Sequence, residues 1–238
     1  MTKVHVLLKK EELDGQRLDG KVVVVLDVLF ATSTMVAALA HGAAEVIPTL
    51  DGDAARRHAL EHAPGCFVLA GELDAVTLDG FTSATPQAVL REMPPGGTLI
   101  YSTTNGTVAL ARAAAAPHVY AAALLNGEAV VERIVREHGD ATVLLVCSGS
   151  ADRFNLEDFY GAGYLVSLFH RAGVRDFTDA AQAAGLLHQG SSAEQCLWSA
   201  RVGRHMLRKD LEDELRFAAR KSCLDVVPKL VDGRLRAT

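Results

Sequence analysis

Short apolar runs alternate with helical patterns as far as residue 147, and this alternation limits the folds that the chain can adopt. Runs of this kind are typical of strands buried on both faces, and the helices between them are typical of parallel crossovers. The sequence therefore predicts an α/β fold with three layers, α/β/α, around a mainly parallel sheet. The predicted strands are Val4–Leu8, Val22–Asp27, Glu45–Pro48, Cys66–Ala70, Thr98–Ser102, His118–Ala121 and Thr142–Cys147.

The chain is mostly helical in pattern from Asn155 onward. Ser191–Leu207 is predicted to be one helix, because Ser191 and Glu194 have the spacing of a capping box. A last strand is expected within Leu224–Val231. The sequence has 238 residues, 49% of them hydrophobic, and it shows no linker. We therefore expect a single domain over residues 1–238, built as one unit or as two intimate halves.

Small polar residues follow three of the predicted strands. "ATSTMVAALAHGAAEV" at Ala31 and "STTNGTVALARAAAAPHV" at Ser102 both run from hydroxyl residues into an alanine-rich helix, and Thr142 starts a third unit of this kind. The likeness leaves an internal duplication of βα units open. The carboxyl ends of strands are where open α/β sheets bind ligands, and free N–H groups at helix starts favour anions.

Charge and composition exclude several kinds of partner. The net charge is −5 and no basic run with interleaved aromatic residues is present, so we expect no binding to nucleic acid. The start of the chain does not resemble a signal peptide, and no stretch is apolar enough to span a bilayer, so we expect a cytoplasmic protein without a membrane partner. The four cysteines form no C-x-x-C pair and are expected to be reduced. We also expect a homo-oligomer.

Asp27 ends the apolar run "VVVVLD", where an unpaired carboxylate would be costly. It is either a loop cap that accepts from nearby N–H groups or a functional group, namely a metal ligand or a nucleophile. A hydroxyl cluster follows it at the start of a predicted helix, and we expect this cluster to donate to an anionic group. The cluster consists of Thr32, Ser33 and Thr34.

Two further segments offer groups for an anion. "TTNGT", Thr103–Thr107, could cradle an oxyanion, and the same N–H groups also serve helix capping, so both roles hold together. The residues expected to bind substrate there are Thr103, Thr104, Asn105, Gly106 and Thr107. In "CSGSADRFNLED" the spacing of Cys147 and Arg153 is that of thiol phosphatases, but the usual preceding histidine is Val146. We expect Cys147 to be a core residue, and Gly149 and Arg153 to contact the substrate.

Acidic residues supply the candidates for catalysis and metal binding. Glu157 and Asp158 fall in the first turn of a predicted helix, where they serve either as a metal-binding pair or as simple partners of the helix dipole. Glu72 follows a strand and a glycine, and it is either an exposed loop acid or a catalytic group. Asp27, Glu72 and Asp158 are the predicted catalytic residues.

Taken together, these motifs resemble the 2-phosphosulfolactate phosphatase (ComB) family over nearly the whole chain. The matching segments are "DVLFATSTMVAAL" at Asp27, "GEL" at Gly71, "GF" at Gly80, "TTNGT" at Thr103, "CSGSADRFNLEDFYGAG" at Cys147 and "DELRFAARKSCLDVVPKLVDG" at Asp213. The resemblance implies a Mg²⁺-dependent phosphatase that acts on a small anionic phosphorylated substrate. It implies metal ligands at Asp27, Glu157, Asp158 and Asp225, because hard oxygen ligands suit Mg²⁺.

The chain departs from the family pattern where substrate is expected to bind. The pattern has arginine at the positions of Phe30 and Leu73 and glycine at that of Asp74, and "GFTSATP" at Gly80 is shorter than its counterpart. Bidentate arginine contacts are the strongest way to hold a phosphosulfonate, so their loss predicts poor turnover of 2-phosphosulfolactate, with partial recovery in a Phe30→Arg, Leu73→Arg double variant. Two hypotheses follow: a phosphatase with altered specificity, or a catalytically silent protein that binds an anion or serves in assembly.

Overall fold

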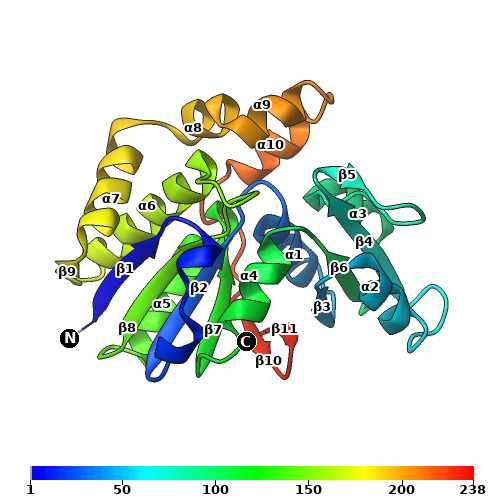
Figure 1. Ribbon diagram of the computed structural model, residues 1–238, viewed down its shortest axis with the longest axis horizontal. Helices are drawn as coiled ribbons and strands as arrows, with labels where there is room; N and C mark the ends of the chain where they lie inside the picture. Colours follow the sequence, from blue (N-terminus) through cyan, green and yellow to red (C-terminus); the bar gives the residue numbers. More distant parts are fainter. Residues whose placement is uncertain (1) are drawn as a thin grey trace.

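The computed structural model describes residues 2–238, which build one eleven-stranded sheet with helices packed against it (Figure 1). The strand order across the sheet is β5-β4-β6-β3-β11-β10-β7-β2-β8-β1-β9. The strands are β1 (Lys3–Leu7), β2 (Lys21–Leu26), β3 (Glu45–Thr49), β4 (Phe67–Leu73), β5 (Val76–Thr77), β6 (Thr98–Ser102), β7 (His118–Ala122), β8 (Thr142–Cys147), β9 (Asp176–Phe177), β10 (Pro228–Val231) and β11 (Arg234–Ala237).

The helices connect these strands and then continue beyond β9. They are α1 (Ala31–Ala40), α2 (Gly52–Ala59), α3 (Pro86–Glu92), α4 (Gly106–Ala113), α5 (Gly127–Glu137), α6 (Leu156–Arg171), α7 (Asp179–Gly190), α8 (Ala193–Ser199), α9 (Arg201–Leu207) and α10 (Glu212–Ala218). Short 3-10 helices cover Lys10–Glu12, Gly15–Arg17 and Leu124–Asn126. No helix within residues 2–238 is long and apolar enough to cross a membrane.

The valine run of β2 separates two hydrophobic cores. Val22, Val24 and Leu26 face the core shared with α5, α6 and α7, whereas Val23 and Val25 face the core shared with α1, α3 and α4. A strand buried on both faces needs apolar residues at every position, which explains the unbroken run. The two cores lie on opposite faces of the sheet and confirm the predicted α/β fold with a mainly parallel sheet.

The sheet contains two parallel blocks, and an antiparallel hairpin joins them. One block is β4, β6 and β3, the other is β7, β2, β8, β1 and β9, and β10–β11 lies between them. Within the second block Leu26 pairs with both Ala122 and Cys147, so the carboxyl ends of three neighbouring strands are level. The expected strand in Leu224–Val231 is β10, and it turns into β11 at Asp232 and Gly233.

The predicted single helix Ser191–Leu207 was wrong. The structure divides it into α8 and α9, with Ala200 between them in an extended conformation (ψ 151°). The capping box also lies one residue later than predicted, since Ser192 Oγ accepts from the Gln195 N–H at 3.1 Å. The break brings Gly203 against the end of α8 so closely that a Cβ at this position would overlap the Leu197 carbonyl group. As a result α9 lies across the carboxyl ends of the strands (Figure 1).

Candidate active site

A cavity of about 290 Å³ lies where the loops after β2, β4, β6 and β8 meet α9. Carboxylates line one part of the cavity. Basic side chains of α9, and of Arg208 just after it, line another part. The lining residues are Asp27, Phe30, Glu72, Asp74, Ala75, Asn105, Ser150, Ala151, Asn155, Glu157, Arg201, Val202, His205 and Arg208. A small, concave site with a few convergent polar groups is the usual form of an active site.

Asp27 lies between the first residues of two helices. Its carboxylate accepts from the backbone N–H groups of Ala31, which begins α1, and Gly106, which begins α4. A Cβ on Gly106 would lie 2.7 Å from Asp27 Oδ2, so only glycine lets the α4 backbone approach this closely. The Thr32 hydroxyl lies 3.0 Å from both the N–H and the carbonyl oxygen of Asp27 and fixes the turn.

The pKa of Asp27 is raised to about 6, first by burial and then by the charge of Glu72. The N–H groups of Ala31 and Gly106 and the charge of Lys10 act in the opposite direction. These donors stabilise the ionised form, and burial opposes it. Asp27 is therefore a carboxylate that titrates close to neutral pH, as groups at reaction centres often do.

Glu157 and Asp158, in the first turn of α6, have different surroundings. The Asp158 carboxylate accepts from the Val28 N–H at 2.9 Å and the Gly149 N–H at 3.2 Å, so it joins the loops after β2 and β8. Glu157 is only 2% exposed, and its Oε2 has no hydrogen-bond partner within residues 2–238. Glu157 therefore has an oxygen free for a ligand, whereas both oxygens of Asp158 hold the backbone.

Burial and mutual repulsion raise the pKa of both carboxyls. The pKa of Glu157 rises to about 7, chiefly through burial and then through the charge of Asp27, while Arg201 lowers it. The pKa of Asp158 rises well above its ordinary value through burial and the charges of Asp27 and Glu157. Carboxylates that repel one another in a buried site either keep protons or bind a cation.

Glu72, at the carboxyl end of β4, holds two loops together. It accepts from the Thr104 N–H at 2.8 Å, from the Thr104 hydroxyl at 2.9 Å and from the Ala75 N–H at 2.5 Å. These bonds fix the loop after β6 against the β4–β5 turn. Glu72 thus lines the cavity and also positions its wall.

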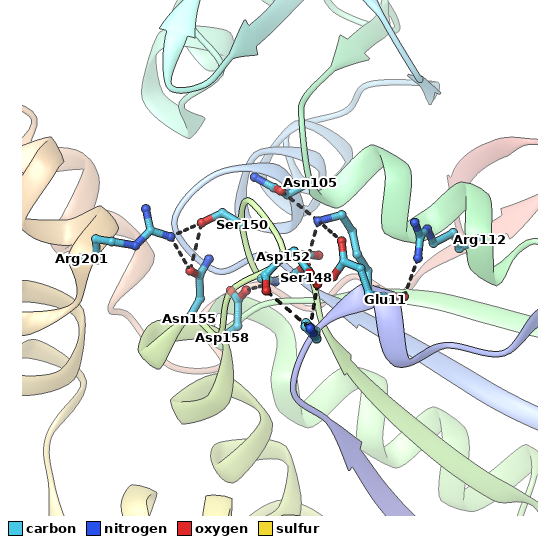
Figure 2. Close-up of polar contacts among 12 residues, drawn as sticks. Glu11, Asn105, Arg112, Ser148, Ser150, Asp152, Asn155, Asp158 and Arg201 are labelled. Carbon is cyan, nitrogen blue, oxygen red and sulfur yellow. Dashed lines mark hydrogen bonds and ion pairs between the residues drawn. The ribbon is translucent and has the colours of Figure 1, made fainter.

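Two basic groups stand close to these carboxylates, and neither was predicted from the sequence. The buried Lys10 ammonium donates to Asn105 Oδ1 at 3.0 Å and to the Ser148 carbonyl at 3.3 Å, and it pairs with Glu11 (Figure 2). Arg201 Nη2 donates to Ser150 Oγ and, at 3.1 Å, to Asn155 Oδ1 (Figure 2).

The predicted substrate-binding hydroxyls are mostly engaged in local bonds. Ser33 donates to the Val28 carbonyl, and Thr34 donates to the carbonyls of Phe30 and Ala84. Thr103 and Thr107 bond to each other, including Thr107 Oγ1 to the Thr103 carbonyl at 2.8 Å. Of the predicted substrate-binding residues only Asn105 lines the cavity, while Thr32, Ser33, Thr34, Thr103, Thr104, Gly106, Thr107, Gly149 and Arg153 lie outside its lining.

Three other predictions concern residues near this edge of the sheet. Asp27, Thr103 and Cys147 follow or end β2, β6 and β8, and the contact of Asp27 with Gly106 brings these strand ends together as expected. Cys147 is completely buried, and burial raises the pKa of its thiol well above the ordinary value, as befits a core residue. Asp225 and Arg153 are exposed and lie outside the cavity lining.

The carboxylates do not form a closed metal site by themselves. Among residues 2–238 no group of three or more His, Cys, Asp or Glu side chains is arranged to hold a metal ion. An ion that keeps several waters and binds the phosphate of a substrate needs only one or two protein carboxylates. Asp27 and Glu157, which both line the cavity, can supply that number.

Comparison with known proteins shows which family the sequence belongs to. A sequence model described as 2-phosphosulpholactate phosphatase matches residues 7–233. A probable 2-phosphosulfolactate phosphatase of Clostridium perfringens (strain SM101 / Type A) is 32% identical over 98% of this chain and 96% of its own length. A protein of the same description from Symbiobacterium thermophilum is 34% identical over 93% of this chain and 96% of its own length. Another, from Carboxydothermus hydrogenoformans, is 32% identical over 98% of this chain and 96% of its own length. The chain therefore belongs to the 2-phosphosulfolactate phosphatase family of phosphoric monoester hydrolases.

Proposed function

We propose that this phosphatase is Mg²⁺-dependent and hydrolyses the phosphate monoester of a small acid, with a specificity altered from that of 2-phosphosulfolactate phosphatase. One observation carries the proposal: Glu157 Oε2 is buried without a partner within residues 2–238, and the charge of a second, half-buried carboxylate in the same cavity, Asp27, raises the pKa of Glu157. A buried carboxylate oxygen without a donor costs free energy unless a cation or a proton meets it. The phosphate of a substrate would bring further negative charge to the same place.

Magnesium suits a pair of carboxylates. It prefers hard oxygen ligands, keeps several waters and completes its shell with phosphate oxygens. Asp27 and Glu157 would hold it, and no cysteine or histidine is needed. When bound, the ion would neutralise charge on the phosphoryl group that is transferred. Asp158 and Glu72 would keep the surrounding loops in place, because their oxygens already accept from backbone N–H groups.

The two helix starts around Asp27 would act on the phosphate through their dipoles. The N–H groups of Ala31 and Gly106 already donate to the Asp27 carboxylate, but the positive ends of α1 and α4 meet there and favour negative charge nearby. Lys10 adds a buried positive charge behind Asn105. Asp27 would either attack the phosphorus or orient a water that attacks it. The stereochemical course at a chiral phosphorus separates the two, because two successive displacements give retention and a single displacement by water gives inversion.

The cavity fits a compact substrate that is only partly polar. Phe30, Ala75, Ala151 and Val202 give it apolar walls, and Phe30 occupies a position where the family pattern has arginine. Leu73, at the second such position, is 59% exposed and does not line the cavity. An apolar ring near the phosphate favours a substrate that is less charged than a phosphosulfonate.

A phosphate-release screen tests the proposal. The purified protein is incubated with 2-phosphosulfolactate, 2-phospholactate and phosphoglycolate, each with Mg²⁺ and with a chelator. We expect release that needs Mg²⁺, is lost in Asp27→Asn and is slower for 2-phosphosulfolactate than for the best carboxylate substrate. Release that persists with chelator would exclude the metal. Binding of these anions without any release would favour the catalytically silent alternative.

A further inference from the structure

The basic wall of the cavity comes from one short segment, and no sequence motif had assigned it a function. Arg201, His205 and Arg208 are four and three residues apart, so they share one face of α9 and its C-terminal continuation. All three line the cavity, together with Val202. No carboxylate within residues 2–238 forms an ion pair with either arginine. Two guanidinium groups without acidic partners thus face a small cavity.

The segment is held at both ends by the loops that form the site. At its start Arg201 donates to Ser150 and Asn155 in the loop after β8 (Figure 2). Beyond its end Lys209 donates to the Ala75 carbonyl in the β4–β5 turn at 3.0 Å. The basic face therefore lines the same cavity as Asp27 and Glu157, and the bonds at its two ends hold it to two of the loops that form that cavity.

A third polar group on this face also lacks a partner. His205 Nε2 is buried and makes no hydrogen bond within residues 2–238. An unpartnered ring nitrogen in a cavity wall is costly unless a ligand or water meets it. Its place between the two arginines makes the face a set of donors suited to a planar or tetrahedral oxyanion.

We propose that Arg201, His205 and Arg208 bind the acidic group of the substrate that is not transferred, a carboxylate or sulfonate, and so set the specificity of this phosphatase. The proposal rests on the proposed function for the position of the phosphate. The cavity separates its charges: the carboxylates and helix starts hold the metal and the phosphate, and the basic face receives the second anion.

Substrate discrimination tests the assignment, because it does not depend on the fraction of folded enzyme. We compare kcat/KM for an acid-bearing substrate, 2-phospholactate, with that for ethyl phosphate, which lacks the second anion. Arg208→Met should lower the ratio of kcat/KM for 2-phospholactate to that for ethyl phosphate roughly tenfold or more, which is the value of one charge-assisted hydrogen bond. The loss should appear as a higher KM for 2-phospholactate. Arg208→Lys should recover part of it. Arg204→Met is the matched control, since Arg204 is on the same helix but its side chain donates to the Ser199 carbonyl and does not line the cavity.

A binding measurement separates this proposal from the proposed function. Sulfoacetate, which has a sulfonate and a carboxylate but no phosphate, is titrated into the chelated protein by calorimetry. We expect binding by the unmodified protein and by Arg204→Met, with at least tenfold weaker binding by Arg208→Met and Arg201→Met. This result would stand even if no phosphate were released. Equal binding by all four proteins, or an unchanged ratio of kcat/KM, would overturn the assignment while leaving the phosphatase proposal intact.

Discussion

Replacement of Glu157 by glutamine should stabilise the metal-free protein near neutral pH and remove its activity. Glu157 is buried, one of its oxygens has no partner, and its pKa is raised to about 7 from an ordinary 4.5. The folded protein therefore holds a proton on Glu157 more tightly than the unfolded chain does. Stability from this residue is fully present below the unfolded pKa and is lost as the pH rises through about 7.

The size of this stabilisation follows from the difference between the pKa of Glu157 in the folded protein and its ordinary value. A change of one in pKa corresponds to about 1.4 kcal/mol, so ionising Glu157 in the folded protein costs up to about 3 kcal/mol at high pH. A glutamine amide has a similar shape and no charge, but it still leaves polar atoms buried. We therefore expect Glu157→Gln to raise the free energy of unfolding by about 1–2 kcal/mol at about pH 8 and by little at about pH 5.

Urea denaturation with chelator present, at about pH 5 and about pH 8, measures the difference in free energy of unfolding between Glu157→Gln and the unmodified protein. Glu132→Gln, on the exposed face of α5, is the control for loss of a glutamate charge far from the site. Addition of Mg²⁺ at about pH 8 should then stabilise the unmodified protein by about 2–3 kcal/mol at a hundredfold excess over its Kd, and Glu157→Gln by much less. The reasoning would be refuted if Glu157→Gln were less stable than the unmodified protein at about pH 8, or if Mg²⁺ stabilised both proteins equally.

Three further predictions concern the same cavity. Cys147→Ser should keep most of the phosphatase activity because the thiol is buried and its pKa is raised, whereas Asp27→Asn should abolish phosphate release; a trapped phosphocysteine would reverse this assignment. Gly106→Ala should cost about 2–4 kcal/mol in urea denaturation and most of the activity, because its Cβ would lie 2.7 Å from Asp27 Oδ2. Phe30→Arg alone should improve turnover of 2-phosphosulfolactate, and Leu73→Arg should add little, since Leu73 lies outside the cavity lining; equal gains from both would contradict this geometry.

The sequence was sufficient to predict a mainly parallel sheet and the edge of that sheet where Asp27, Thr103 and Cys147 lie. Apolar runs such as Val22–Asp27 predict buried strands, and a carboxylate at the end of such a run needs a special environment, which Asp27 has between two helix starts. Turn chemistry also predicts the β10–β11 hairpin, which was missed, because Asp232 and Gly233 both have positive φ angles (49° and 75°) and Asp-Gly is a strong hairpin signal.

Other features depend on tertiary contacts that a single sequence does not reveal. "SARVGRHML" has a helical pattern throughout, yet Ala200 is extended between α8 and α9, and Gly203 permits the close contact with Leu197 that results. Hydroxyls at a helix start have the same spacing whether they bind a ligand or a local carbonyl, and here Ser33 binds the Val28 carbonyl. The i, i+4 spacing of Arg201 and His205 was visible, but only the fold shows that this face meets the carboxylates.

The arrangement of bonds around the cavity separates the requirements of catalysis from those of specificity. Asp158 joins the loops after β2 and β8, and Glu72 joins the β4–β5 turn to the loop after β6, so the loops that carry Asp27 and Glu157 are held together by charged acceptors of backbone N–H groups. Arg201 at the start of α9 and Lys209 beyond its end donate hydrogen bonds to these loops. Arg201 also acts on Glu157, whose pKa it lowers, whereas Arg208 is not among the groups that shift the pKa of Asp27 or Glu157. On the proposed assignment, substitution of Arg208 should therefore change which acid is bound with less effect on the phosphate site than substitution of Arg201.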